Sequence, residues 1–257
     1  MIPVPVYGII SDMKNYRLTV SYDGSRYRGF QRQSSTASTI QGKLEAALSG
    51  ILEQDIEIAA SGRTDAGVHA AMQVCSFKAE TALSCDAVLS SLRRFLPEDI
   101  AALSLEEAAP RFHARLNCKA KTYVYTLRTA AVQNVFLRDF EYHLPCKLDA
   151  EAMRSAAAYL IGEHDFRAFT SEKRIKKSTV RTIYSIDINV SEETVRFVLR
   201  GNGFLYNMIR IIVGTLIEVG RGDRSVESVK NALDSLEREN AGFTAPAKGL
   251  TLQSVEY

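Results

Sequence analysis

The sequence predicts an α+β protein in which two similar halves share one mixed, largely antiparallel sheet flanked by helices. Three observations support this fold class. Segments with alternating apolar residues outnumber segments with helical spacing. Several of these strands are joined by short turns, which favours antiparallel pairing. The pattern of strands and helices before Pro110 recurs after it without a low-complexity linker, so we expect the halves to share a sheet.

The first half is expected to place two helices among its strands. Its first strand alternates Leu18, Val20 and Tyr22 on one face. Apolar residues at helical spacing, Ile40 and Leu44 among them, follow this strand. The expected elements are a strand at 16–24, a helix capped by Ser38 or Thr39, strands at 55–60 and 71–79, a helix that follows Ser84 or Asp86 and stops at Pro97, and a strand at 100–108.

The second half is expected to repeat this arrangement. A strand at 121–127 carries Tyr123 and Tyr125 on one face, and a helix begins at Asp149. Further elements are strands at 179–190 (with Val180, Tyr184, Ile186, Ile188 and Val190 alternating), 194–200 and 250–257, and helices at 205–219 and 225–238. The chain is therefore divided into an N-terminal extension (1–15), a first half (16–109) and a second half (110–257).

The composition is that of an ordinary globular protein, with a net charge of only +2. The most apolar stretch, 208–213, is too short to cross a membrane, and the N-terminus lacks the basic region of a signal peptide. We therefore expect a cytoplasmic protein without a membrane segment. Four scattered cysteines without a CxxC pair predict reduced, mostly buried thiols and no zinc site: Cys75, Cys85, Cys118 and Cys146.

Basic residues are concentrated in two segments and one loop. Residues 111–128 hold five Lys/Arg and no acid, and residues 167–181 hold six against Glu172 alone. The loop 25–33 adds three arginines among aromatic residues. Basic clusters with interleaved aromatic residues suit a polyanion whose bases can stack. A set of solvated faces, balanced by acids elsewhere, is the alternative, and charge alone does not decide between them.

The segment "SGRTDAGVHA", 61–70, has the highest density of side chains that can take part in catalysis, with Arg63, Thr64, Asp65 and His69 among small residues. Its glycines permit unusual backbone angles and close approach of another molecule. Asp65 is a candidate catalytic carboxylate. The alternative is a purely structural turn in which Asp65 binds its own backbone.

Arg210 lies in the most apolar expected helix, among Val213 and Ile217. A guanidinium in such surroundings is costly unless a carboxylate or phosphate pairs with it. Pairing with Asp65 would keep that carboxylate ionised, and Gly214 leaves room for another backbone. The alternative is a side chain that extends to the solvent.

Other motifs are weaker. Tyr123 and Tyr125 suit either a core or a base-stacking surface. The "GNGF" segment, 201–204, lacks the third glycine of a dinucleotide-binding loop. His143 and His164 have no metal-like spacing, and we interpret both as structural.

Eight segments in order resemble the tRNA pseudouridine synthase A (TruA) family, from about residue 16 to the C-terminus. They are "YDGSRYRGFQRQ" (22–33), "TIQGKLEAAL" (39–48), "GRTDAGVHA" (62–70), "FHAR" (112–115), "KTYVY" (121–125), "GEHDF" (162–166), "GNGFLYNMIRIIVG" (201–214) and "APAKGLTL" (245–252).

The resemblance implies isomerisation of uridine to pseudouridine in the anticodon stem-loop of tRNA by a homodimer, without metal or organic cofactor. It implies that Asp65 is the catalytic aspartate, that Tyr123 lies beside the target base, that Arg210 pairs with Asp65, and that Arg63 assists nucleotide flipping. It also implies a fold of two similar α+β halves with a mixed central sheet. The further RNA-binding residues that we expect are Arg28, Gln31, His113, Arg115 and Lys121.

This chemistry accounts for the residue types. The C1′–N1 bond must break and a C1′–C5 bond must form, and one carboxylate can serve as nucleophile or take a proton from the sugar. A glycoside hydrolase would need a second catalytic carboxylate, which the loop lacks. Departures from the family pattern at Phe30, Ser61, Met72 and Lys121 leave room for a paralogue that acts on another RNA. The remaining alternative is an RNA-binding module without catalysis, and the presence of Asp65 argues against it.

Overall fold

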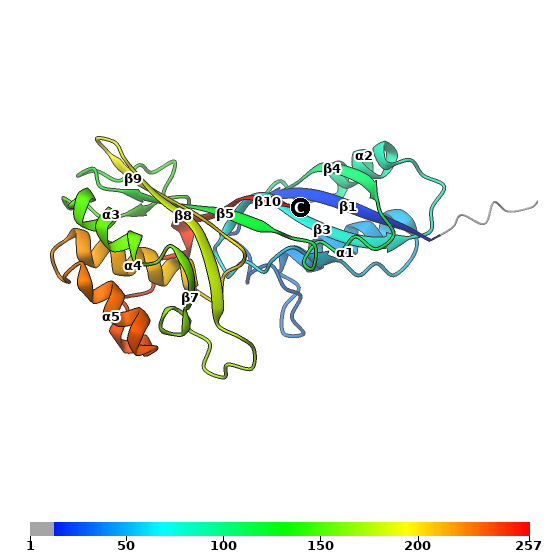
Figure 1. The fold of residues 1–257 in the computed structure, drawn as a ribbon. Coiled ribbons are helices and arrows are strands. Elements are labelled where there is room, and N and C mark those ends of the chain that lie inside the picture. The colour runs from blue at the N-terminus through cyan, green and yellow to red at the C-terminus, as the bar shows by residue number, and fades with distance from the viewer. Residues whose placement is uncertain (1–12) are drawn as a thin grey trace, which may run out of the picture.

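A computed structural model describes residues 13–257, in which one ten-stranded sheet runs through both halves (Figure 1). The strand order is β4-β1-β3-β10-β5-β9-β8-β7, with β2 paired to β3 and β6 to β5. The strands are β1 (Lys14–Tyr22), β2 (Ala59–Ala60), β3 (His69–Ala79), β4 (Ile100–Ala108), β5 (Ala120–Arg128), β6 (Tyr142–His143), β7 (Gly162–Asp165), β8 (Val180–Val190), β9 (Thr194–Gly201) and β10 (Leu250–Glu256). The predicted mixed, largely antiparallel sheet is confirmed, because among the described strands only the β10–β3 and β5–β6 pairs are parallel.

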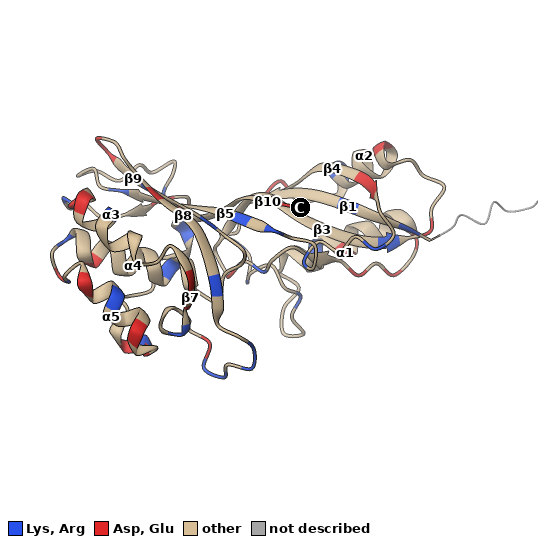
Figure 2. Cartoon of the chain, viewed as in Figure 1, with Lys and Arg blue, Asp and Glu red and all other residues tan. Residues whose placement is uncertain are grey.

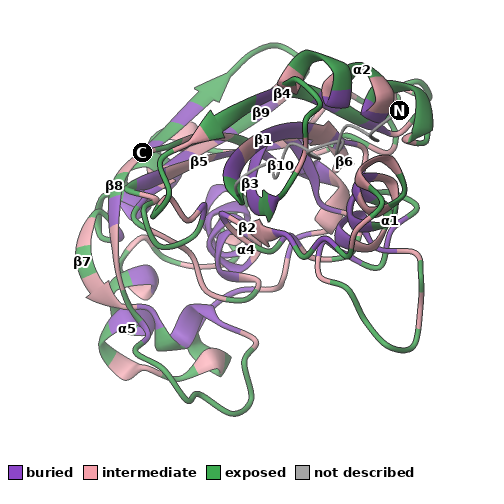
Figure 3. Ribbon diagram, turned by 90° about the vertical axis from the view of Figure 1, so that its right-hand side faces the viewer, coloured by how far each residue is buried: buried purple, intermediate pink, exposed green. Residues whose placement is uncertain are grey.

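The helices α1, α4 and α5 lie below this sheet in Figure 3, whereas α2 lies at its upper edge beside β4. Two of the predicted caps are made by Thr39, which accepts from the Gly42 N–H, and Ser84, which accepts from the Ala87 N–H. The helices are α1 (Ile40–Leu52), α2 (Cys85–Phe95), α3 (Ala150–Ala158), α4 (Met208–Gly220) and α5 (Glu227–Ser235), with 3₁₀ turns at Arg167–Phe169, Arg238–Asn240 and Ala247–Gly249.

The C-terminal strand β10 joins the two halves. It pairs in parallel with β3, where Leu252 lies opposite Ala70, and antiparallel with β5, where Leu252 lies opposite Tyr123. The segment that precedes β3 is 61–68. Insertion of β10 therefore places this segment and Tyr123 on neighbouring parts of the same sheet.

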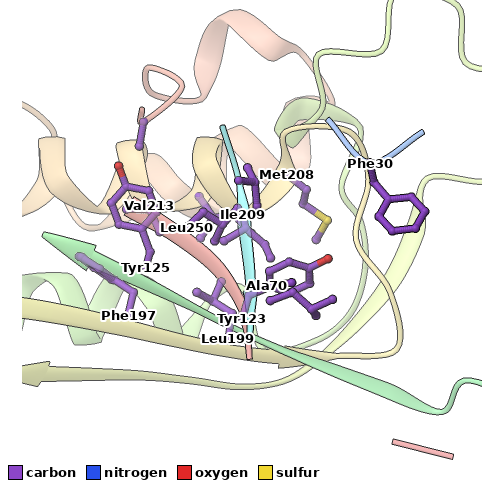
Figure 4. Packing of buried hydrophobic residues seen from close by; sticks show 14 of the residues in the cluster. Phe30, Ala70, Tyr123, Tyr125, Phe197, Leu199, Met208, Ile209, Val213 and Leu250 are labelled. Carbon is purple, nitrogen blue, oxygen red and sulfur yellow. The ribbon is translucent and has the colours of Figure 1, made fainter. Parts of the chain in front are cut away.

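The core lies between the sheet and α4, whose apolar residues are buried almost all round the helix. Figure 4 shows Tyr123 and Tyr125 along β5 beneath this helix, with Tyr123 near Met208 and Tyr125 near Val213. Each such large apolar side chain contributes roughly 1.5–3 kcal/mol when it is fully buried. This packing fixes the beginning of α4 against the middle of the sheet.

The predicted strand at 55–60 forms only at its last two residues, Ala59–Ala60. In the residues before Ala59, backbone N–H groups are bound by side chains of α1: Ile56 N–H donates to Ser49 Oγ, and Ile58 N–H donates to Glu45 Oε1. A strand needs those N–H groups for a neighbouring strand. The local polar side chains therefore prevent pairing.

The alternation predicted for β8 is wrong in part. Val180, Tyr184 and Val190 are exposed, whereas Ile183 is buried with Ile186 and Ile188. The register shifts between Ile183 and Ser185, and such a bulge moves the following side chains to the other face. The thiol prediction is also only partly right, because Cys75 is buried and the other three cysteines are half-buried.

Two helices are shorter than predicted. The helix α4 starts at Met208 because Asn207 takes a left-handed conformation with φ 60°. The helix α5 ends at Ser235 because Leu236 does the same. Both are non-glycine residues at positive φ, which ends a right-handed helix. The predicted N-terminal extension lies almost entirely outside the described residues.

Candidate active site

A cleft of about 370 Å³ opens between the segment that precedes β3 and the beginning of α4. It brings together six residues that the sequence analysis selected: Arg63, Asp65, Arg115, Lys121, Tyr123 and Arg210. They come from four separate parts of the chain, which only the shared sheet places side by side. The rest of the lining is Ser61, Gly62, Thr64, Val68, Glu172, Arg181, Phe204, Leu205, Tyr206, Asn207, Met208, Ile209 and Leu250.

The segment 61–70 is held from behind by the loop that follows β1. Phe30 N–H donates to Thr64 O at 3.0 Å, and the Tyr22 hydroxyl lies 2.8 Å from Thr64 Oγ1. His69 is buried and accepts from the Gly24 N–H through Nδ1. These bonds fix the backbone on both sides of Asp65, so its carboxylate is presented from a rigid support.

Asp65 directs its carboxylate into the cleft. The turn that contains it is closed by the backbone, since Val68 N–H donates to Asp65 O at 3.1 Å and Gly67 takes φ +79°. Within residues 13–257, no backbone N–H donates to the Asp65 carboxylate. The alternative of a turn stabilised by this side chain therefore does not apply.

Arg210 faces Asp65, with 3.6 Å between Arg210 Nη1 and Asp65 Oδ2. Nη1 also donates to Asn207 Oδ1 at 2.8 Å, and Nε donates to Ala245 O at 2.7 Å. Only 17% of the Arg210 side chain is exposed, so it does not extend to the solvent. The predicted pairing is thus present in the geometry, and three groups orient the guanidinium.

Gly214 has the predicted role of admitting another backbone. A Cβ at this position would overlap the Phe243 carbonyl. The segment that approaches there continues to Ala245, whose N–H donates to Arg210 O at 3.0 Å. Close contact at Gly214 therefore positions a carbonyl acceptor of Arg210.

Burial raises the pKa of Asp65, and Arg210 lowers it by charge and hydrogen bonding, with a net upward shift. The nearby cation therefore opposes the desolvation of the carboxylate without cancelling it. A carboxylate that is poorly solvated and only partly neutralised is a stronger base than one in water. This property suits either proton abstraction or attack on carbon.

Tyr123 forms a wall of the cleft, whereas Tyr125 belongs to the core. The Tyr123 ring meets Phe204 edge to face at 5.4 Å and is 7% exposed, and burial raises the pKa of its hydroxyl. Tyr123 is therefore a neutral phenol. Tyr125 instead donates its hydroxyl hydrogen bond to Pro246 O at 2.9 Å. The core alternative therefore holds for Tyr125, and Tyr123 is a buried residue that also lines the cleft.

Three other expected RNA-binding residues lie outside the lining of the cleft. Arg28 is exposed and Gln31 half-buried in the loop between β1 and α1. His113 accepts from the Arg115 and Leu116 N–H groups through Nδ1, so it shapes the turn that carries Arg115. The structure does not bring these three together with Asp65.

Several lining residues were not among those predicted from the sequence, above all Arg181, Glu172, Phe204 and Asn207. Signals for them existed. Arg181 and Glu172 belong to the basic segment 167–181, and Phe204 ends the "GNGF" segment. Asn207 holds Arg210 from a left-handed conformation, which asparagine tolerates better than most residues.

In the described part of the chain, no three His, Cys, Asp or Glu side chains are grouped so that they could hold a metal ion. Among the same residues, no helix is both long and apolar enough to cross a membrane.

A single partly buried carboxylate, faced by an arginine in a cleft with several cations, fits an enzyme that acts on an anionic substrate. The family model described as tRNA pseudouridine synthase matches residues 18–117 and 156–257. The chain is 44% identical to tRNA pseudouridine synthase A 2 of Bacillus cereus (strain ATCC 14579), over 95% of this chain and 100% of that protein. It is 46% identical to tRNA pseudouridine synthase A of Geobacillus sp. (strain WCH70), over 95% and 98% of the two chains.

This chain belongs to the tRNA pseudouridine synthase family. Among solved structures, an H/ACA RNP bound to a substrate RNA containing 2′-deoxyuridine aligns with a TM-score of 0.37 at 14% identity. The alignment covers 79% of this chain and 44% of that one.

Proposed function

We propose that the protein isomerises uridine to pseudouridine in the anticodon stem-loop of tRNA, with Asp65 as its catalytic residue. The observation that carries this proposal is the Asp65–Arg210 pair, 3.6 Å apart in the cleft beside Tyr123. Family membership supports the tRNA substrate. The resemblance to the TruA family supports the anticodon stem-loop.

In this reaction the uracil exchanges its N1–C1′ bond for a C5–C1′ bond to the same ribose. Asp65 acts on the sugar in one of two ways. It attacks C1′ as the C1′–N1 bond breaks, and its own bond to C1′ breaks when C5 attacks; or it accepts a ribose proton as N1 leaves and returns it to the same carbon when the C1′–C5 bond forms. After the C1′–C5 bond forms, the C5 proton leaves and N1 carries a proton, so the product is an isomer of the substrate. The Arg210 guanidinium limits the pKa of Asp65.

The walls of the cleft serve to retain the detached base. Tyr123, Phe204 and Leu250 supply apolar surface around the Asp65 carboxylate. A cleft of about 370 Å³ suits one extruded nucleotide rather than a duplex. Uracil that is confined by these side chains can rotate and present C5 without diffusing away.

Cations at the entrance contribute most of the affinity for RNA. Arg63 and Arg115 are exposed at the cleft, and Lys121 lines it. The loop before β8 adds further Lys and Arg and projects from the sheet (Figure 2). Arg28, Gln31 and His113 would contact more distant parts of the RNA. Phosphate contacts by such residues make the affinity strongly dependent on salt.

A homodimer and a cytoplasmic location complete the proposal. The resemblance implies a dimer, and the segment 132–137 offers an apolar surface for a second copy. Val132, Val135 and Phe136 are 77%, 60% and 88% exposed there. Monomeric proteins seldom expose such groups of large apolar side chains without a partner. Replacement of Phe136 by Ser should yield a monomer in light-scattering measurements, and a dimer that persists would contradict this surface.

The decisive experiment is incubation of unmodified tRNA with the protein, followed by mapping of pseudouridine. Modification in the anticodon stem-loop is the expected result. Modification of another RNA alone would favour the paralogue, for which the departures at Phe30 and Met72 leave room. An Asp65→Ala variant should lose turnover while its affinity for tRNA stays within about tenfold, because the cations supply most of that affinity. Retained turnover would refute the role of Asp65.

A further inference from the structure

Besides Arg63, three cations of the cleft have no counter-ion among residues 13–257. Arg115, Lys121 and Arg181 all line the cleft, and no described carboxylate lies within 4.0 Å of any of them. Lys121 Nζ donates to Ser61 O at 2.6 Å, which leaves two of its three N–H groups free. Arg181 donates from Nη1 to Ser178 O and Val180 O, and no hydrogen bond from its Nη2 is made within residues 13–257.

Arg115, Lys121 and Arg181 line the same cleft from three parts of the chain, namely the turn before β5, β5 itself and β8. Lys121 is two residues before Tyr123 on β5, so both side chains point to the same face, about 6.6 Å apart along the strand. In the neighbouring strand Gly201 lies opposite Lys121, and its other neighbour is Ile183 on β8. Arg181 is two residues before Ile183 at the beginning of the same strand.

The "GNGF" segment clears the space between them. A Cβ at Gly203 would lie 3.8 Å from Arg181 Nε, so the arginine runs along this backbone. At Gly201 a Cβ would come within 3.1 Å of the Phe204 ring. Glycine at 201 therefore lets Phe204 lie close to the backbone beside Lys121, and Arg181 is in ordinary van der Waals range of the backbone at 203.

The charges of the three residues repel one another. Burial lowers the pKa of Lys121 and of Arg181, and Arg115 lowers both further. Glu172 lines the cleft but does not reach ion-pair distance of any of the three. Like charges that are held together without a counter-ion favour the binding of an anion.

We propose that Arg115, Lys121 and Arg181 jointly bind one phosphodiester group of the RNA, directly beside the nucleotide whose ribose faces Asp65. This inference rests on the proposed function and adds Arg181 to it as a positioning residue. The separation of Lys121 from Tyr123 is about the length of one nucleotide. Arginine forks and an ammonium group together match the oxygens of a phosphate, and each contact is charge-assisted.

The first test compares Arg181→Gln with Arg196→Gln. Arg196 is an exposed arginine on β9 outside the cleft, so its variant controls for the loss of one positive charge. We expect Arg181→Gln to raise the Kd for tRNA and KM by about tenfold to a hundredfold, with a smaller effect on kcat. An effect no larger than that of Arg196→Gln would overturn the proposal.

Salt dependence then distinguishes one shared phosphate from three separate ones. Each phosphate contact in single-stranded nucleic acid contributes about 0.7 to the slope of log Kd against log salt. A triple variant with Gln at 115, 121 and 181 should therefore lower this slope by about 0.7. A decrease of about 2 would mean three separate phosphates and would refute a joint site. Circular dichroism of the triple variant verifies that it is folded.

The second test replaces single phosphodiester linkages around the target uridine with uncharged methylphosphonates. At one flanking linkage, the wild type should lose as much affinity as the triple variant loses on normal RNA, and the triple variant should lose little more. Equal penalties for wild type and variant at every linkage would contradict the proposal. This test measures Kd, so it does not depend on turnover. An RNA that is bound but not converted would count against the proposed function and would still test the phosphate site.

Discussion

Replacement of Arg210 by Met tests how the charge pair sustains both the fold and the reaction. Methionine keeps much of the length and apolar surface of arginine but removes the charge. The Asp65 carboxylate, the Asn207 amide oxygen and the Ala245 carbonyl would each lose their donor. The substitution therefore removes the guanidinium that three groups contact at once.

The magnitude follows from burial and distance. Removal of one member of a fully buried ion pair costs about 3–5 kcal/mol. Here the two side chains remain 17% and 23% exposed and their closest charged atoms lie 3.6 Å apart, which lowers the cost. We expect a loss of about 2–3 kcal/mol, which lowers Tm by roughly 5–10 °C in a chain of this size. Differential scanning fluorimetry with Arg196→Met as control measures it.

The same variant should change the pH dependence of turnover. Arg210 now lowers the pKa of Asp65 against the upward effect of burial, so its removal raises that pKa further. If the ionised carboxylate is required, the acid limb of the kcat/KM profile moves to higher pH. An unshifted acid limb together with an unchanged Tm would refute the argued role of the pair.

Three further predictions use matched variants. Asp65→Asn should be inactive yet have a higher Tm at neutral pH, because burial raises the pKa of Asp65 and its ionisation therefore opposes folding; this advantage should vanish on acidification below the pKa of the unfolded chain. Tyr125→Phe should cost about 1–2 kcal/mol at unchanged kcat, whereas Tyr123→Phe, which breaks no hydrogen bond, should leave Tm unchanged and lower kcat/KM. Leu252→Ala and Leu18→Ala should each cost about 2–5 kcal/mol in chemical denaturation, but only the former should also lower kcat.

The sequence predicted most of the elements because their signals are local. Alternation identified β1, β5 and β9, and Thr39 and Ser84 cap helices as their residue types indicate. The errors occurred where a tertiary contact overrides the local pattern. The side chains of Ser49 and Glu45 accept hydrogen bonds from the N–H groups of residues 56 and 58. The bulge in β8 changes which residues of that strand face the core, and the sequence alone does not show where this bulge lies.

The site was predictable to the extent that its residues stand in distinctive motifs. Asp65 stands out among small residues, and Arg210 stands out because a charge in an apolar helix needs a partner. Arg181 lies among five other basic residues between 167 and 181, and local sequence does not indicate which of them points into the cleft. Burial and the register of β8 select it, and both depend on the whole sheet.

The position of β10 explains why the site needs both halves. Residues 69 and 251 pair in parallel. Parallel pairing requires a long connection, and here the connection is all of the chain from β3 to β10. No periodicity within β10 indicates that it will lie between β3 and β5. Yet without it the segment that carries Asp65 and the strand that carries Tyr123 and Lys121 would not be neighbours. The Asp65 carboxylate and the cleft wall that carries Tyr123 and Lys121 are therefore brought together by β10, so the cleft depends on residues of both halves.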